Sequence, residues 1–214
     1  MPYRQLVLDP HTPARALNLI HRIEDHYFQD VRAMFRLPAP ELGITAGCNF
    51  AIAQTLLAVV SGVSVTLFEH GGSKGKGRRF KDLLVAYYPW EDEPTAERQD
   101  REHASQIYSL VRNPLAHDLG LDLDTKDRTQ RVMVKRLTRA NGTKGRSEAG
   151  VSGLETEVRP AGLSPVLSLD GDSVVLFLDA FYWGVRRMLV KLAADTGRVS
   201  AAETFLSSRE HPGA

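Results

Sequence analysis

The feature that most limits how this 214-residue chain can fold is a run of 25 residues without a charged side chain, from Ile44 to Phe68. A run of this length could cross a bilayer as one helix. Hydroxyl and amide side chains such as those of Asn49, Gln54 and Ser61 interrupt it, however, and no aromatic belt frames it. A helix buried on all sides by its neighbours explains the same pattern. We therefore predict a soluble core helix and no contact with a membrane, with the membrane span as the alternative.

Apolar residues spaced three or four apart predict further helices around this run. The first should extend over residues 12–37, and two shorter ones are expected at residues 80–90 and 95–111. On the first helix the predicted core-facing residues are Ala16, Ile20, Ile23, Tyr27, Val31 and Met34. A core helix surrounded by such amphipathic helices is typical of a helical bundle.

The C-terminal part of the chain also has helical patterns. Asp179 is a suitable cap for a long helix, and Gly197 is a suitable end for it. Ser200 and Glu203 have the spacing of a capping box, which predicts a short terminal helix. The aromatic residues 181–183 could stack on nucleic-acid bases, but core or dimer packing is the more common use of aromatic residues at helical spacing.

Between the predicted helices, the pattern changes to that of short strands. Residues 130–137 alternate in polarity, and residues 166–169 and 173–178 flank an Asp-Gly-Asp turn at 170–172. The glycine- and serine-rich stretch before them allows at most one more strand, near 156–159. We expect a small antiparallel sheet inserted before the last long helix.

The predicted fold class is therefore mainly α: one domain over residues 1–214, with a β insertion at about 126–178. The net charge of +1 excludes a protein that is basic throughout, so contacts to nucleic acid must come from local patches. The single cysteine, Cys48, excludes an intramolecular disulfide and a cysteine-pair metal site. No apolar run follows Met1, so we expect no signal peptide. We predict a cytoplasmic protein without a cofactor. His21 and Asp25 share a helix face, but a solvated face is expected there rather than a metal site.

The candidate site is the six-residue stretch Arg-Asn-Pro-Leu-Ala-His from Arg112 to His117. On a straight helix, residues five positions apart point about 140° away from each other. Pro114 cannot donate to the carbonyl four residues back, so the helix must kink or restart there, and Asn113 is a suitable N-cap for the restart. The kink would bring the Arg112 guanidinium toward the Asn113 amide and the His117 imidazole.

This stretch resembles the RNxxxH form of the HEPN motif, which occurs near the end of the main helices in small up-down α-helical bundles. The resemblance covers about residues 12–120 and 179–195, with the segment between them as an insertion. Family members are commonly metal-independent ribonucleases of toxin–antitoxin and antiviral defence systems. Members paired with a nucleotidyltransferase antitoxin often carry a tyrosine two residues after the histidine. Asp118 and Leu119 follow the histidine here, so regulation through that tyrosine is not expected.

The resemblance implies cleavage of single-stranded RNA by attack of a ribose 2′-hydroxyl on the adjacent phosphate, without a metal. In this reaction His117 would transfer the proton, Arg112 would stabilise the charged transition state, and Asn113 would orient the imidazole or the phosphate. One histidine cannot easily act as both acid and base. We therefore expect a homodimer that brings two motifs together across a two-fold axis, and an antitoxin or regulatory protein as a partner.

Two basic stretches are candidate RNA-binding surfaces. The glycine-rich stretch 71–79 lacks the Walker A spacing, but a flexible basic loop can contact a phosphate backbone. Residues 126–146 hold eight Lys or Arg against one Asp. The predicted RNA-binding residues are Lys74, Lys76, Arg78, Arg79, Arg131 and Lys135. A solvated, non-binding surface is the alternative for both stretches.

The motif has two alternative interpretations. Arg112 could bond helix-end carbonyls or Asp118 while His117 is an ordinary polar residue at a bundle end. The chain could also keep the fold without the chemistry and serve as a non-catalytic nucleotide- or partner-binding module. Intact side chains at all three motif positions favour the ribonuclease.

Overall fold

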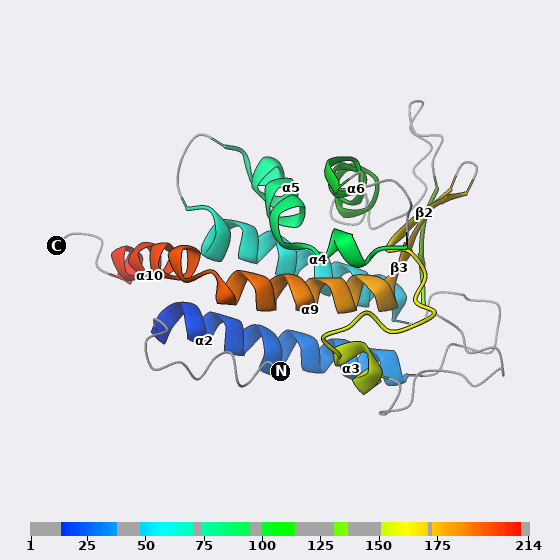
Figure 1. Ribbon diagram of the computed structural model, residues 1–214, viewed down its shortest axis with the longest axis horizontal. Helices are drawn as coiled ribbons and strands as arrows, with labels where there is room; N and C mark the ends of the chain where they lie inside the picture. The colour runs from blue at the N-terminus through cyan, green and yellow to red at the C-terminus, as the bar shows by residue number, and fades with distance from the viewer. Residues whose placement is uncertain are drawn as a thin grey trace.

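The computed structural model describes residues 14–37, 48–70, 74–94, 100–113, 131–136, 151–170 and 173–210. Over these ranges the protein is mostly helical with a small three-stranded sheet. The long helix near the C-terminus runs through the middle, the first helices lie along one side of it, and the sheet lies at one end (Figure 1). The mainly α fold predicted from the sequence is confirmed.

The first helix is continuous but not uniform. It comprises α2 (Ala14–Arg22), a π-helical segment η1 (Ile23–Phe28) and α3 (Gln29–Arg36). The wider π turn rotates the residues after it relative to a regular α-helix. Consequently Phe28 and Phe35 are buried, whereas Tyr27 is 48% exposed and Met34 only partly buried. The prediction that Tyr27 faces the core is wrong for this reason.

The uncharged run forms α4 (Asn49–Val63) and a second π segment, η2 (Ser64–Phe68). By length and composition this helix could span a membrane, but half of its most apolar window is buried inside the protein. Asn49 is itself buried, and its amide donates to the carbonyl of Val134 at 3.2 Å. This burial supports the core-helix prediction for the described part of the run.

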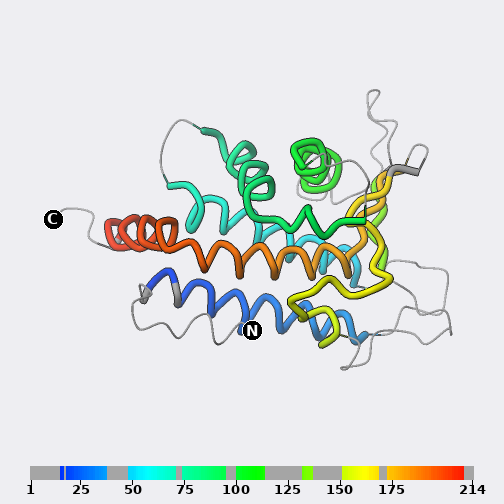
Figure 2. Tube along the Cα trace, viewed as in Figure 1, coloured from blue at the N-terminus to red at the C-terminus, as the bar shows by residue number. Residues whose placement is uncertain are grey.

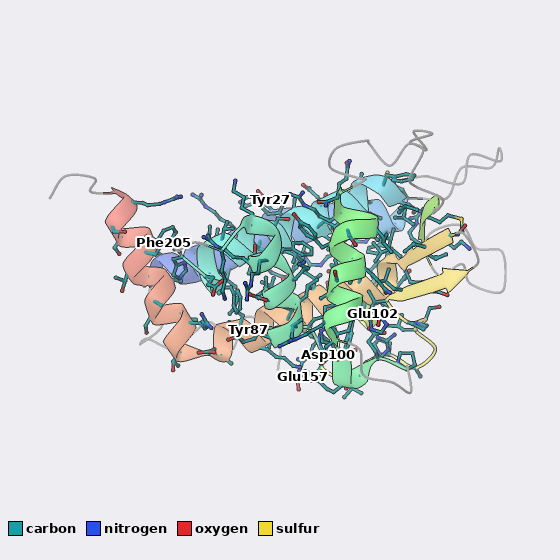
Figure 3. All side chains as sticks on the ribbon, turned by 90° about the horizontal axis from the view of Figure 1, so that it is seen from above. Tyr27, Tyr87, Asp100, Glu102, Glu157 and Phe205 are labelled. Atoms are coloured by element: carbon teal, nitrogen blue, oxygen red, sulfur yellow. The ribbon has the colours of Figure 1, made fainter. Side chains whose placement is uncertain are left out.

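Two helices of the next group pack on each other and lie across the long ones. They are α5 (Lys76–Tyr87), followed by the short η3 (Trp90–Asp92), and α6 (Asp100–Gln106), which continues into the π segment η4 (Ile107–Arg112). In Figure 3, Tyr87 marks α5, and Asp100 and Glu102 mark α6. Helix α5 begins four residues earlier than predicted, so the end of the basic stretch is helical rather than a flexible loop.

The C-terminal helices are α9 (Leu178–Ala194) and α10 (Thr196–Glu210), separated by Asp195 (Figure 2). Asp195 accepts from the backbone N–H of Arg198 at 3.0 Å and so caps α10. The predicted helix end at Gly197 and the capping box at Ser200 are therefore wrong, because both residues lie inside α10.

The side chains of Glu203 and Asp179 do not cap the helices that the sequence predicted them to cap. Glu203 accepts from the backbone N–H groups of Arg15 and Ala16, both at 3.0 Å, and so caps α2 from a distant part of the chain. Asp179 is buried in the first turn of α9, and the cap position is Phe177, without a side-chain cap. The prediction that Asp179 caps α9 is therefore wrong, and Glu203 caps a different helix from the one its spacing predicted.

The sheet contains β1 (Arg131–Lys135), β2 (Leu167–Asp170) and β3 (Ser173–Phe177), in the order β1-β3-β2. The predicted antiparallel pair of β2 and β3 is confirmed, but β1 pairs with β3 in parallel, so the sheet is mixed. Residues 156–159 form no strand. Side-chain alternation predicts strands but carries no information on the direction of pairing. A short 3-10 helix, η5 (Gly153–Glu155), precedes β2.

Helix α9 lies at the centre of the core. Its aromatic residues Phe181, Tyr182 and Trp183 have no exposed surface, so they are core residues and cannot stack on bases in this structure. Gly184 faces the ring of Tyr88, and a Cβ atom there would lie closer than 3.0 Å to that ring. The glycine therefore allows α9 and the end of α5 to approach closely.

Candidate functional site

The candidate motif begins inside the π segment η4. The backbone N–H of Asn113 donates to the carbonyl of Tyr108, five residues back. Asn113 has φ −65° and ψ −50°, so it is a helical residue and not the N-cap that the sequence predicted. Because Pro114 follows and has no N–H to give to the carbonyl four residues back, a widened turn at this position is physically reasonable. Residues 114–117, including His117, lie outside the described residues.

The Arg112 side chain is half-buried and held by two neighbours. Its Nη1 donates to the Asn113 Oδ1 at 3.2 Å, and its Cζ lies 5.6 Å from the centre of the Tyr108 ring. Within the described part of the chain Arg112 forms no ion pair. The motif residues Arg112 and Asn113 are therefore brought together, and most donors of the guanidinium are not used by described residues.

The Tyr108 ring also contacts α5. Its centre lies 5.4 Å from that of Phe80, and the Lys81 Nζ lies 5.7 Å from it. A Cβ atom at Gly77 would lie closer than 3.0 Å to the Tyr108 hydroxyl. One glycine of the basic stretch thus serves helix packing, because only glycine lets Tyr108 lie this close to the backbone of α5.

We call Lys81, Tyr108, Arg112 and Asn113 the Tyr108 cluster. Two positive charges lie within 6 Å of one ring centre, and in the described ranges neither forms an ion pair with a carboxylate. Cationic side chains that no described carboxylate neutralises can bind an anion such as a phosphate.

Sequence reasoning missed Lys81 and Tyr108. A weak signal existed, because Tyr108 is four residues before Arg112 and Gly77 is four residues before Lys81, each about one helical turn. These spacings show which residues share a face of one helix. They do not show that the two faces meet.

Two of the predicted RNA-binding residues in the glycine-rich stretch, Lys74 and Arg78, lie beside carboxylates, unlike Arg112 within the described ranges. Lys74 forms ion pairs with Glu69 at 2.7 Å and Asp82 at 3.3 Å, and these carboxylates raise its pKa. Arg78 lies 3.8 Å from Asp82, Lys76 is exposed and Arg79 is half-buried. Their role in RNA binding stays a prediction.

The second basic stretch is described only at residues 131–136. Arg131 begins β1, and Lys135 ends it with an exposed side chain. Arg136 donates through Nη1 to the carbonyls of Met34, Phe35 and Leu37 at 3.2–3.3 Å. One basic residue of this stretch therefore caps the C-terminal end of α3, where a positive charge is favourable.

A second cluster of charged side chains joins the first helix, η5 and α9. Arg32 pairs with Glu24 and with Glu155 (2.5 Å), and Arg186 pairs with Glu155 at 2.9 Å and Glu24 at 3.4 Å. Burial pushes the pKa of Glu155 upward, but the two arginines and a hydrogen bond from Tyr182 at 2.8 Å outweigh it, so the pKa lies below its usual value. Each charge here has an opposite partner, which fits a structural role better than a reactive one.

Metal ligation was considered for His21 and Asp25. Asp25 is exposed and His21 is partly buried. Among the described residues, no group of three or more His, Cys, Asp or Glu side chains could hold a metal ion. The Tyr108 cluster is therefore the strongest candidate site in the described ranges.

No known family model, curated protein or solved structure matches this chain.

Proposed function

We propose that this protein is a metal-independent endoribonuclease of the HEPN type that cleaves single-stranded RNA. The observation that carries the proposal is the Arg112 guanidinium, which Tyr108 and Asn113 hold while no described carboxylate pairs with it. In the sequence this arginine precedes His117 by five residues, as the RNxxxH motif requires. The mainly α fold, with Arg112 in the π segment η4, is compatible with a HEPN-like up-down bundle.

The proposed reaction needs a base, an acid and a group that stabilises negative charge. Arg112 would stabilise the phosphorane-like transition state through its fork of donors. His117 would take the proton of the 2′-hydroxyl. Asn113 accepts from Arg112 at 3.2 Å, which supports a role in positioning the guanidinium.

The biological setting of the proposed enzyme follows from the same resemblance. We propose a cytoplasmic toxin or antiviral effector whose partners are single-stranded RNA, a second copy of the chain, and an antitoxin or regulatory protein. The two-fold dimer is proposed because two motifs facing one groove could share the acid and base roles.

Arginine variants test the proposal directly. Purified protein is incubated with end-labelled single-stranded RNA, and the rate of cleavage is measured. Arg112→Ala should lower the rate by about 10²- to 10³-fold, as loss of one charge-stabilising donor does in other enzymes. Arg112→Lys should not restore it fully, because lysine lacks the fork.

The matched control is Arg101→Ala, which removes an exposed arginine from α6, the same continuous helix. Its cleavage rate should equal that of wild type. A wild-type protein that binds RNA or a nucleotide without cleaving would instead establish a non-catalytic binding module.

A further inference from the structure

The side chain of His70, two residues after the end of η2, packs against α10. Its imidazole stacks on the ring of Phe205, with the ring centres 4.7 Å apart and the planes 13° from parallel. Phe205 is labelled on α10 in Figure 3. Both ring nitrogens of His70 are enclosed by protein, and neither has a hydrogen-bond partner within the described ranges. The imidazole therefore packs on α10 as an apolar ring does.

Positive charges from two helices lie near this imidazole. Arg198 on α10 donates through Nη1 to the carbonyl of Phe68, two residues before the histidine, at 2.9 Å. Arg209, one helical turn after Phe205, has its Cζ 4.8 Å from the centre of the Phe205 ring. Arg79 on α5 also acts on the imidazole through its charge. A positive charge on the imidazole would therefore meet like charges from both helices.

The described carboxylates near this contact are engaged elsewhere. Glu69, next to His70 in the chain, pairs with Lys74 at 2.7 Å. Asp195, at the start of α10, accepts from a tyrosine on α5, and Glu203 on α10 accepts from backbone N–H groups of α2. Helix α4, which continues into η2, contains no charged residue. Within the described ranges, an imidazolium at this position would have no carboxylate partner.

These surroundings favour the neutral imidazole. Burial lowers the pKa of His70 most, and the charges of Arg198 and Arg79 lower it further, while the Val65 carbonyl, outside hydrogen-bond geometry, opposes them in part. An imidazolium would be attracted to the face of the Phe205 ring, but an enclosed charge without a counter-ion costs more than this contact offsets. Because the folded pKa is the lower one, the stability that the neutral ring contributes is present above about pH 6.5 and is lost as the pH falls through the folded value.

We propose that the stacking of His70 on Phe205 is a pH-sensitive contact, which holds α10 on η2 while the imidazole is neutral and releases α10 when the imidazole is protonated. Once α10 has moved away, the imidazole is exposed to water and binds a proton at its usual pKa. Release of α10 also removes Glu203 from the N–H groups of Arg15 and Ala16, so it uncaps α2. The pH-sensitive contact is independent of the RNA cleavage proposed above.

Hydrogen exchange at the backbone amides of α10 measures how often this helix is released. At pH 5.5, one unit below the usual histidine pKa, wild-type α10 should have about three- to tenfold less protection than at pH 7.5, after correction for the intrinsic exchange rate. His70→Phe keeps an aromatic ring on Phe205 but cannot bind a proton. The protection of α10 in this variant should be the same at both pH values.

The matched control is His103→Phe. His103 also lies beside an aromatic ring, with its ring centre 5.6 Å from that of Trp90, but it belongs to α6. Its replacement should leave the wild-type pH response of α10 unchanged. A pH response of α10 that is as large in His70→Phe as in wild type, or that is absent from wild type, would overturn the proposal.

A second measurement on wild type does not depend on the folding of His70→Phe. The imidazole resonances of His70, assigned by their loss in His70→Gln, are followed by NMR as the pH is lowered. A pKa of His70 below about 6.5, with loss of α10 protection over the same pH range, supports the proposal. A pKa at or above that value would overturn it, because protonation would then not destabilise the docked helix.

Discussion

Two weak contacts hold the Arg112 guanidinium: the Tyr108 ring and the Asn113 amide. A cation–π contact at a partly exposed site contributes about 0.5–1 kcal/mol, and a hydrogen bond to a charged group about 1.5–3 kcal/mol. Neither contact alone is much larger than the entropy of an arginine side chain, which is about 2 kcal/mol. The direction of the guanidinium should therefore depend on both neighbours.

Gly77→Ala tests whether the position of Tyr108 matters for activity. The added methyl group would meet the Tyr108 hydroxyl, so the ring must move and Arg112 must lose part of its support. Alanine is also favoured over glycine in a helix by about 1 kcal/mol, which offsets the lost packing. We expect RNA cleavage to fall at least about tenfold while the thermal midpoint changes little.

The control for this variant is Gly75→Ala, two residues away at the start of α5, where a Cβ atom has open space. Equal cleavage rates for Gly77→Ala and Gly75→Ala, both near wild type, would show that the Tyr108 ring does not position the site.

At the scale of single residues, the sequence identified candidate side chains but not the residues that surround them. The spacing from Arg112 to His117 identified a candidate site, and the structure brings Arg112 and Asn113 together. The cluster also contains Lys81 on α5 and Tyr108 on η4. The contact between these two side chains depends on how the two helices pack against each other. That information is tertiary and is not contained in the periodicity of either helix.

Among the elements, the helices were predictable and their π segments were not. Apolar spacing located the helices, because burial of one face is what stabilises them. Each π segment adds a residue to a turn. Within η1 the buried position is therefore Phe28 instead of Tyr27, and nothing in the sequence marks this change. The parallel pairing of β1 was missed because alternation does not encode direction.

The contact of α9 with Tyr88 gives a prediction about stability. Gly184→Ala would force a methyl group into the Tyr88 ring, which is fully enclosed against Trp90 and Phe181. Overpacking of this kind costs about 1–3 kcal/mol, and each kcal/mol lowers the midpoint of a chain of this size by about 2–4 °C. Thermal unfolding followed by circular dichroism measures the shift.

Gly62→Ala is the matched control, because Gly62 is exposed within α4 and a Cβ atom there meets nothing. This change should raise the midpoint slightly through helix propensity. An unchanged midpoint for Gly184→Ala would mean that α9 and Tyr88 are not packed as described.

The charged cluster between the first helix and α9 predicts a pH dependence. The pKa of Glu155 is lower in the folded state than in the unfolded chain, so the unfolded chain binds a proton first as the pH falls. The contribution of Glu155 to stability is present above the usual glutamate pKa, about 4.3, and is lost as the pH falls through its lower folded value. Glu155→Gln should reduce stability at neutral pH and flatten the loss of stability in acid.

The thermal midpoint measured between pH 7 and pH 3 tests this expectation. Asp30→Asn is the control, since Asp30 is exposed on α3 and its loss should leave the acid dependence unchanged. A Glu155→Gln midpoint that falls in acid as steeply as that of wild type would rule out Glu155 as a source of the pH dependence.

For the whole molecule, the open question is how many copies make one active site. A two-fold dimer would bring two His117 residues to one groove, where one could act as the base and the other as the acid. We expect a homodimer by light scattering at micromolar concentration. A monomer that cleaves RNA fully would remove the need for the dimer and leave the acid role to a residue of the same chain.

The most direct test of the account as a whole is the chemistry of the ends that cleavage leaves. Wild-type protein is incubated with single-stranded RNA, and with DNA of the same sequence, in the presence of a metal chelator. We predict cleavage of the RNA alone, leaving a 2′,3′-cyclic phosphate and a 5′-hydroxyl, and a loss of about 10²- to 10⁴-fold for His117→Ala. Cleavage that requires magnesium, or an undiminished rate for His117→Ala, would contradict it.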